Sequence, residues 1–309
     1  MSTITTINNK YSLKRITRKW QLYLIILLPI IHTFIFAYIP MYGVTLAFRD
    51  FSIRDGIMGS PWVGLRHINQ FFNSPNFWLL MRNTLALSVY TLAVGLPAPI
   101  ILALCLNEVR LKYFKRLVQT VTYAPFFIST VVMVGMMLQI LALRGGFVNN
   151  IIMMLGGEPI NFMGEASMFR SIFVLSGVWQ GMGFSAVLYI ASLASVDENL
   201  YEAAIIDGAN RIQKIRHIDF PAILPTIIIV LIMSVGSIMN VGPERVLLMQ
   251  NNLNLINSEI ISTYVYKIGL LRGDFSFATA VGLFNTVINF VLLFSVNKIC
   301  QKLSATSMW

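Results

Sequence analysis

Six apolar stretches, each long enough to cross a bilayer as a helix, constrain this fold more than any other feature of the sequence. A hydrocarbon core of about 30 Å requires about 20 helical residues. The six stretches contain none of the 23 Lys and Arg residues and none of the 13 Asp and Glu residues. We therefore predict an all-α polytopic membrane protein with six transmembrane helices. The predicted spans are Leu22–Ala47, Asn83–Leu106, Leu117–Leu143, Ser171–Ser195, Pro221–Gly242 and Phe277–Val296.

The composition excludes two other common classes of chain. Only 12% of the residues are charged and 56% are hydrophobic, whereas an ordinary soluble domain has roughly 25% charged residues. Intrinsically disordered chains are polar and rich in charge. The first apolar stretch follows a basic segment, as in a signal peptide, but it is too long for an h-region and no small-residue cleavage site follows it. We therefore expect an uncleaved first span.

The distribution of Lys and Arg indicates which side of the membrane each loop occupies. Cytoplasmic loops are enriched in these residues, and placing both termini in the cytoplasm puts 14 of them inside and nine outside. This topology explains the net charge of +10 without a nucleic-acid partner. The expected organisation is a basic cytoplasmic N-terminus (1–21), a first transmembrane helix (22–47), an outer loop (48–81), a core domain with five transmembrane helices (82–297) and a cytoplasmic tail (298–309).

The residue inventory argues against several functions. Ionisable groups inside the membrane usually mark proton relays, ion sites or voltage sensors, and the six spans have none apart from His32. The sequence has no GxSxG serine elbow, no HExxH zinc motif and no GxxxxGK[ST] phosphate loop. We therefore expect no catalytic residues and no metal site, and any energy for active transport must come from a partner. A sodium-coupled carrier that uses backbone carbonyls stays open.

The most informative segment lies on the cytoplasmic side before the fifth span, from Ser195 to Pro225. Ser195 and Glu198 fit the S-x-x-E capping box, which predicts a short helix to about Ile206. Gly208 suits a left-handed helix stop, and a second short helix is expected from about Asn210 to Ile218. The product is a helix-turn-helix elbow. It is either an amphipathic connector on the membrane surface or a docking site for a soluble partner.

The same segment resembles the EAA loop of binding-protein-dependent ABC importer permeases. The family pattern is EAA, two residues, DGA, eight residues, I, two residues, P, three residues and P. Further resemblance to the subgroup that imports oligosaccharides or polysaccharide fragments lies in Ile39–Gly43, Gly59–Leu65, Arg82–Leu85 and Ser262–Tyr266. The residues of the pattern in this chain are Glu202, Ala203, Ala204, Asp207, Gly208, Ala209, Ile218, Pro221 and Pro225.

The resemblance implies a type I ABC importer permease fold in a bacterial plasma (inner) membrane, with residues 198–220 as the loop that couples to an ATPase. It implies a second permease subunit in a heterodimer, two ATPase subunits and an extracellular solute-binding protein. ATP and Mg would be used by the ATPase, and this chain would bind no cofactor. Glu202 would pair with a cation on the ATPase, the alanines would allow close approach and Gly208 would allow the turn. Asp207 would either cap the second helix or contact the partner.

Polar residues at helical spacing within the apolar spans are candidates for the lining of a substrate path. Hydroxyls, amides and aromatic faces suit a sugar, which requires hydrogen bonds and stacking. The same residues would also serve as hydrogen-bonding groups between helices, and the sequence leaves this alternative open. The candidates are Trp179, Gln180, Ser185, Tyr189, Ser234, Ser237, Asn240, Asn285 and Asn289.

We therefore expect a non-catalytic permease subunit of an ATP-driven carbohydrate importer that forms half of the translocation path within membrane lipid. An ABC permease for another solute, such as a phosphorylated polyol, a polyamine or a peptide, is the nearer alternative. An ion-coupled secondary transporter is the more distant one.

Overall fold

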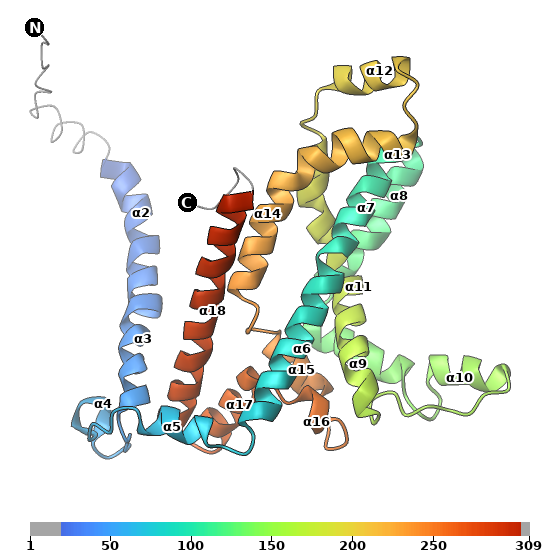
Figure 1. Ribbon diagram of the computed structural model, residues 1–309. Coiled ribbons are helices and arrows are strands. Elements are labelled where there is room, and N and C mark those ends of the chain that lie inside the picture. Colours follow the sequence, from blue (N-terminus) through green and yellow to red (C-terminus); the bar gives the residue numbers. More distant parts are fainter. Residues whose placement is uncertain (1–19, 304–309) are drawn as a thin grey trace, which may run out of the picture.

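The computed structural model describes residues 20–303 as a bundle of long helices joined by short ones, with no strand in that range (Figure 1). Residues 1–19 of the expected basic N-terminus and residues 304–309 of the expected tail lie outside the described residues. Within residues 20–303, five helices are long and apolar enough to cross a membrane, and a bent pair makes a sixth span if it is counted as one. The five are Trp20–Phe48, Phe77–Glu108, Ala166–Leu193, Arg211–Gly236 and Phe275–Lys302.

The predicted third span, Leu117–Leu143, is not one helix. The helical run Lys112–Phe127, which begins with α8 (Lys112–Tyr123), and α9 (Thr130–Ile140) meet at an angle of 103°. Pro125 removes a backbone donor near the break, and Ser129 adopts an extended conformation as the N-cap of α9, where its side chain accepts a hydrogen bond from the amide of Val132. A new helix with its own cap therefore begins inside the apolar run.

The fifth span begins earlier and ends earlier than the predicted Pro221–Gly242. α13 (Arg211–Lys214) runs through a wider turn at Ile215–Asp219 into α14 (Phe220–Gly236) without a break. Pro221 lies inside this continuous run, directly after the wider turn, and removes one of its backbone donors. The expected second short helix of the elbow is therefore continuous with the fifth span.

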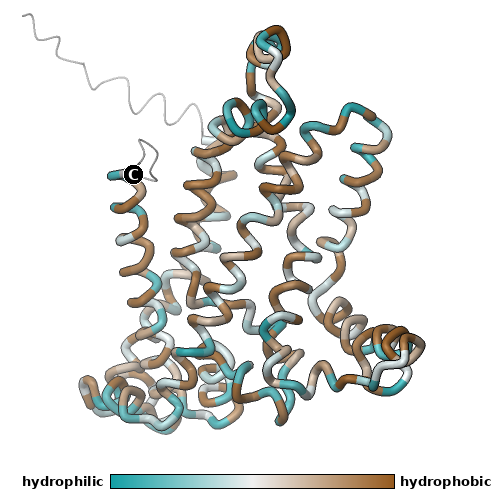
Figure 2. Tube along the Cα trace, turned by 45° about the vertical axis from the view of Figure 1, so that its right-hand side comes forward, coloured by the Kyte–Doolittle hydropathy of each residue, from teal (hydrophilic) through white to brown (hydrophobic). Residues whose placement is uncertain are grey.

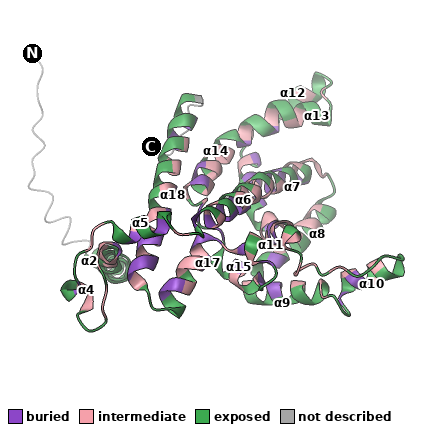
Figure 3. Ribbon diagram, turned by 60° about the horizontal axis from the view of Figure 1, so that its bottom comes forward, coloured by how far each residue is buried: buried purple, intermediate pink, exposed green. Residues whose placement is uncertain are grey.

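The first span lies at the edge of the bundle. α2 (Trp20–Thr33) has no buried residue, and only the end of this span, at Tyr42–Phe48, packs on α18 (Phe275–Leu303) (Figures 1 and 3). The expected outer loop 48–81 folds into α4 (Gly56–Gly59) and α5 (Arg66–Phe72), and it ends earlier than predicted because α6 (Phe77–Gly95) already begins at Phe77. All of α2 is therefore available for contact with lipid or with a partner.

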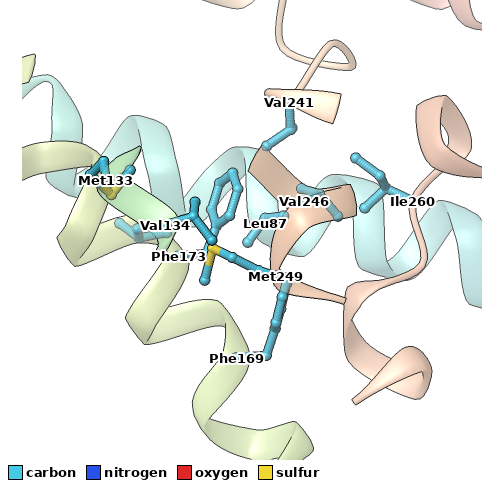
Figure 4. Packing of buried hydrophobic residues seen from close by; sticks show 10 residues of the cluster. Leu87, Met133, Val134, Phe169, Phe173, Val241, Val246, Met249 and Ile260 are labelled. Carbon is cyan, nitrogen blue, oxygen red and sulfur yellow. The ribbon is translucent and has the colours of Figure 1, made fainter. Parts of the chain in front are cut away.

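The packed core surrounds α11 (Ala166–Leu193), which contacts α6, α7 (Pro97–Glu108), α8 and α14. One apolar cluster joins Leu87 of α6, Phe173 of α11 and Val246 of α15 (Pro243–Met249) (Figure 4). Hydrophobic residues dominate along the spans, whereas hydrophilic residues gather at the two ends of the bundle (Figure 2). The remaining short helices are α10 (Phe147–Met154), α16 (Leu255–Ser258) and α17 (Ile261–Tyr266), with a wider turn at Lys267–Leu271.

The two ends of the bundle differ. α12 (Glu198–Ile206) and α13 project from one end, where α2 begins and α18 ends (Figure 1). The short helices α4, α5, α10 and α16 lie at the opposite end (Figure 1). The described ends of the chain therefore share a side with the elbow, as a topology with both termini cytoplasmic requires.

Candidate functional site

The elbow begins with a different cap from the predicted one. Asp197 is the N-cap of α12, and its carboxylate accepts a hydrogen bond from the amide of Asn199 at 3.0 Å. Ser195 instead donates its hydroxyl to the carbonyl of Ser192 at the end of α11. The predicted Ser195–Glu198 capping box is therefore wrong, because Asp197 is closer to the first turn and carries the charge that a helix N-terminus favours.

Gly208 ends the elbow helix as predicted. Its φ of +75° lies in the left-handed region, where a side chain is strained. The amide of Ala209 then bonds to the carbonyl of Ala204 at 2.8 Å, which closes the helix end. The hypothesis that Asp207 caps the second helix is wrong: Asn210 is that N-cap, in a reciprocal capping box with Gln213. The carboxylate of Asp207 is therefore left for contact outside the elbow.

The elbow exposes apolar side chains that the bundle does not cover. Leu200 is 53% exposed, Ile205 61% and Ile206 86%. Glu202 and Ala203 are exposed on the same short helix. A hollow of about 300 Å³ lies between α12 and α13. Its lining includes five residues of the EAA-like pattern, namely Ala204, Asp207, Gly208, Ala209 and Ile218.

A buried polar cluster holds the elbow against the bundle. The hydroxyl of Tyr201 donates to Oδ1 of Asp219 at 2.5 Å, and Nδ2 of Asn107 donates to the same oxygen at 3.3 Å. Asp219 is fully buried. Burial, followed by the hydrogen bond to Asp219, raises the pKa of Tyr201 to about 12, so the hydroxyl remains a donor at neutral pH. The cluster ties α12, the base of α14 and the end of α7 together.

A second tie lies beside the first. Nζ of Lys214 is 3.4 Å from Oε1 of Glu108, and both side chains are mostly buried. Glu108 ends α7 and Lys214 ends α13. The elbow is therefore joined to the second and fifth spans by side-chain contacts as well as by the continuous backbone.

The second part of the candidate site is a partly open cavity of about 580 Å³ between α6, α7, α11, α14 and α15. Its volume is within the usual range for small-ligand sites, about 300–1,000 Å³. Two of its polar atoms, Oγ1 of Thr91 and the hydroxyl of Tyr189, are buried without a protein hydrogen-bond partner. Such atoms are usually satisfied, so the cavity offers hydrogen-bonding capacity to a ligand. The polar side chains of the lining are Ser88, Thr91, Ser185, Tyr189, Ser234, Ser237, Asn240 and Arg245.

The structure divides the nine residues that the sequence singled out for a substrate path. The cavity lining brings five of them together, from α11, α14 and the segment after α14. They are Ser185, Tyr189, Ser234, Ser237 and Asn240.

The other four lie elsewhere. Trp179 lines a separate apolar hollow with Met133, Met136 and Ile172. Nε2 of Gln180 donates to the carbonyl of Ile128 at the bend of the third span. These two residues therefore lie away from the cavity.

Asn285 and Asn289 of α18 are buried in contacts between helices. Nδ2 of Asn285 donates to Oδ1 of Asn240 at 2.9 Å, and Oδ1 of Asn289 accepts from the amide of Met239 at 3.0 Å. These bonds hold the irregular segment after α14 against α18. Both residues therefore fit the alternative of hydrogen bonding between helices.

The sequence reasoning missed Arg245. Because this residue follows the predicted fifth span, it was counted among the charges of the outer loops. α14 ends at Gly236, and the chain then turns so that Arg245 of α15 lines the cavity. A charged residue at the edge of an apolar run is ordinarily interpreted as an interfacial residue. No local pattern distinguishes an interfacial residue from one that lines a cavity.

The comparisons with known proteins fit this geometry. Residues 95–304 match the family model described as "Binding-protein-dependent transport system inner membrane component". The chain belongs to this family. The match begins inside the second span and runs through the sixth, including the elbow, and it leaves out the exposed first span. The family is one of transport permease subunits, and the chain is a multi-pass membrane protein.

Two similar proteins come from Bacillus subtilis. The chain is 42% identical over 290 residues to the polygalacturonan/rhamnogalacturonan transport system permease protein YteP of Bacillus subtilis, covering 94% of this chain and 90% of that protein. It is 44% identical over 284 residues to protein LplB of Bacillus subtilis, covering 92% of this chain and 89% of that protein.

A solved structure has the same fold. It belongs to a bacterial ABC transporter involved in the import of the acidic polysaccharide alginate, with a TM-score of 0.88, 37% identity and coverage of 94% of this chain and 98% of that chain. A second structure of an alginate ABC transporter, with a TM-score of 0.89 and 36% identity, contains a periplasmic protein bound to an alginate pentasaccharide. The type I permease fold inferred from the EAA-like pattern is confirmed.

Proposed function

We propose that this chain forms half of the translocation path of an ATP-driven importer of oligosaccharides or polysaccharide fragments in a bacterial plasma membrane. Its partners would be a second permease, two ATPase subunits that bind ATP and Mg, and an extracellular solute-binding protein. α12 would dock on an ATPase subunit, and the cavity would receive the sugar during its passage.

The observation that carries this proposal is the outward-facing apolar surface of α12. Leu200, Ile205 and Ile206 expose apolar area at the end of a protein that projects beyond its spans. In water this area costs about 25 cal/mol per Å². A soluble subunit that covers it would recover this free energy, and Asp207 and Glu202 would supply the polar contacts at the rim.

The connections of α12 support a role in coupling rather than simple attachment. α12 is bonded through Tyr201 to Asp219, at the base of the fifth span. The fifth span continues to Ser234 and leads into Ser237, which both line the cavity. A push on α12 would therefore move one wall of the cavity, and ATP-driven closure of the ATPase pair would switch that wall between inward-facing and outward-facing positions.

A matched pair of glycine substitutions tests the proposal. Gly208→Asp places a side chain at a φ of +75° in the elbow, and Gly156→Asp places the same side chain at a φ of +83° at the opposite end of the bundle. Neither glycine has an atom within 4 Å of an added Cβ, so the backbone strain is matched. We expect Gly208→Asp to abolish cargo-stimulated ATP hydrolysis and uptake, with normal insertion in the membrane.

Gly156→Asp controls for strain, and Glu202→Lys provides a second elbow variant that does not strain the backbone. Glu202→Lys should also uncouple hydrolysis from uptake, and Gly156→Asp should retain both activities. Full coupling in both elbow variants would contradict the proposal, as would ATP hydrolysis by this chain purified alone.

A further inference from the structure

A guanidinium group without a carboxylate partner projects into the central cavity. Arg245 lines the cavity and forms no salt bridge with any described Asp or Glu. Its Nε is buried and lacks a protein hydrogen-bond partner. Unpaired charges in a poorly solvated environment are costly. The cavity therefore carries a positive charge that a ligand would compensate.

The surroundings hold this group in place. The Cζ atom lies 3.9 Å from the ring centroid of Phe173, a fully buried residue of α11, in a cation–π arrangement. Gly177, one turn further along α11, provides the space: an added Cβ there would lie 2.2 Å from Nη1 of Arg245. Burial lowers the pKa of Arg245 to about 10, so the group is still charged at neutral pH.

The chemistry of the lining indicates which ligand fits. The Thr91 and Tyr189 hydroxyls lack protein partners, and with other hydroxyls and amides they suit the hydroxyl groups of a sugar. A guanidinium pairs best with a planar carboxylate, to which it donates two parallel hydrogen bonds. A neutral sugar would leave the charge of Arg245 uncompensated, whereas a sugar acid would satisfy both kinds of group.

We infer that Arg245 is a carboxylate-binding residue of the translocation cavity, and that the cargo is an oligosaccharide containing uronic acid residues. This inference rests on the proposed carbohydrate import and narrows its substrate class. Arg245 would bind one carboxylate of the chain at a time. The cation–π contact with Phe173 stabilises the guanidinium when no ligand is bound. The carboxylate would therefore bind weakly enough to be released again during passage.

The experiment uses cells of the source organism whose gene for this chain is replaced by variants, so that all natural partner subunits are present. Uptake is measured with radiolabelled trigalacturonate and trimannuronate, and with galactotriose and mannotriose as neutral counterparts of the same size. The wild type should import at least one acidic trimer faster than its neutral counterpart. Import of neutral trimers alone would overturn the inference and leave the proposed function intact, whereas import of none would overturn the proposed function.

The variants test the residue itself. Loss of a charge-assisted hydrogen bond is expected to lower the uptake of the acidic trimer about tenfold in Arg245→Gln, and Arg245→Lys, which retains the charge, should recover part of that loss. Gly177→Ala should displace the guanidinium and lower the uptake of the acidic trimer by a similar factor. Loss of helix stability would not explain this result, because alanine favours a helix more than glycine does. Gly181→Ala on the same helix adds a Cβ with no atom within 4 Å and should have no effect.

Membrane levels of each variant are measured by immunoblotting to normalise the rates. Wild-type uptake of acidic trimers by both Arg245→Gln and Gly177→Ala would overturn the inference. So would equal losses in Gly177→Ala and Gly181→Ala, because the effect would then not depend on the position of the guanidinium.

Discussion

The elbow and the central cavity are built in opposite ways. The elbow comes from one continuous segment, its apolar side chains face outward, and Leu200 and Ile206 are 53% and 86% exposed. The cavity is assembled from α6, α7, α11, α14 and α15, and its polar groups face inward. Contacts with another protein can therefore be encoded locally, whereas a path for a solute depends on the packing of the whole bundle.

The fifth span joins the two regions, with the elbow held at Asp219 and the cavity lined from Val230 onward, and the largest expected effect comes from removing the Asp219 anchor. Asp219→Ala would leave the hydroxyl of Tyr201 and the amide of Asn107 without their shared acceptor. Buried groups that lose their partners cost about 1–3 kcal/mol each. We expect uptake to fall to background, together with a lower thermal unfolding temperature in detergent.

Asp55→Ala provides the control for this substitution. Asp55 is exposed at the opposite end of the bundle, and its carboxylate makes no capping bond. Its removal should change neither uptake nor unfolding temperature. If Asp219→Ala behaved in the same way as Asp55→Ala, the elbow would not depend on a buried anchor, and the proposed transmission to the cavity would fail.

The contrast also explains how much could be predicted from the sequence. Spans were predictable because a charge-free run of about 20 residues has few alternatives to a membrane helix. The turn at Gly208 was predictable because its geometry depends on a few neighbouring residues. The bend at Ile128–Ser129 was not predicted, since an apolar run looks the same whether it is straight or broken. Ser195 was mistaken for the N-cap because Asp197, two residues later, competes for the same role.

The cavity was predicted less well for a related reason. Asn289 and Ser237 both look like polar residues on an apolar helix, and only the packing of α18 against the end of α14 distinguishes them. Arg245 was missed because the end of the fifth span was placed beyond Gly236. The role of a residue that depends on partners far away in the sequence cannot be predicted from local patterns.

Smaller effects on stability and uptake are expected from two substitutions that distinguish a residue bonded between helices from a residue that lines the cavity. Asn289→Leu would leave the buried amide of Met239 without its acceptor, which should cost about 1 kcal/mol of stability and leave the preference among cargoes unchanged. Ser237→Ala removes a hydroxyl of the lining, and it should leave stability within about 0.5 kcal/mol and lower uptake a few-fold. Unfolding temperatures and uptake rates of the two variants distinguish the roles, and the opposite pattern would refute this division.

The most direct test of the central claim is a cross-linking measurement in the intact membrane. The two cysteines of the chain, Cys105 and Cys300, are first replaced by serine. Single cysteines are then introduced by Ile206→Cys on the elbow or Met154→Cys at the opposite end, two positions that are 86% and 84% exposed. We predict that a short thiol-to-amine cross-linker joins the ATPase subunit to the Ile206→Cys variant and not to the Met154→Cys variant. A cross-link to the ATPase from Met154→Cys, or none from Ile206→Cys, would contradict the account.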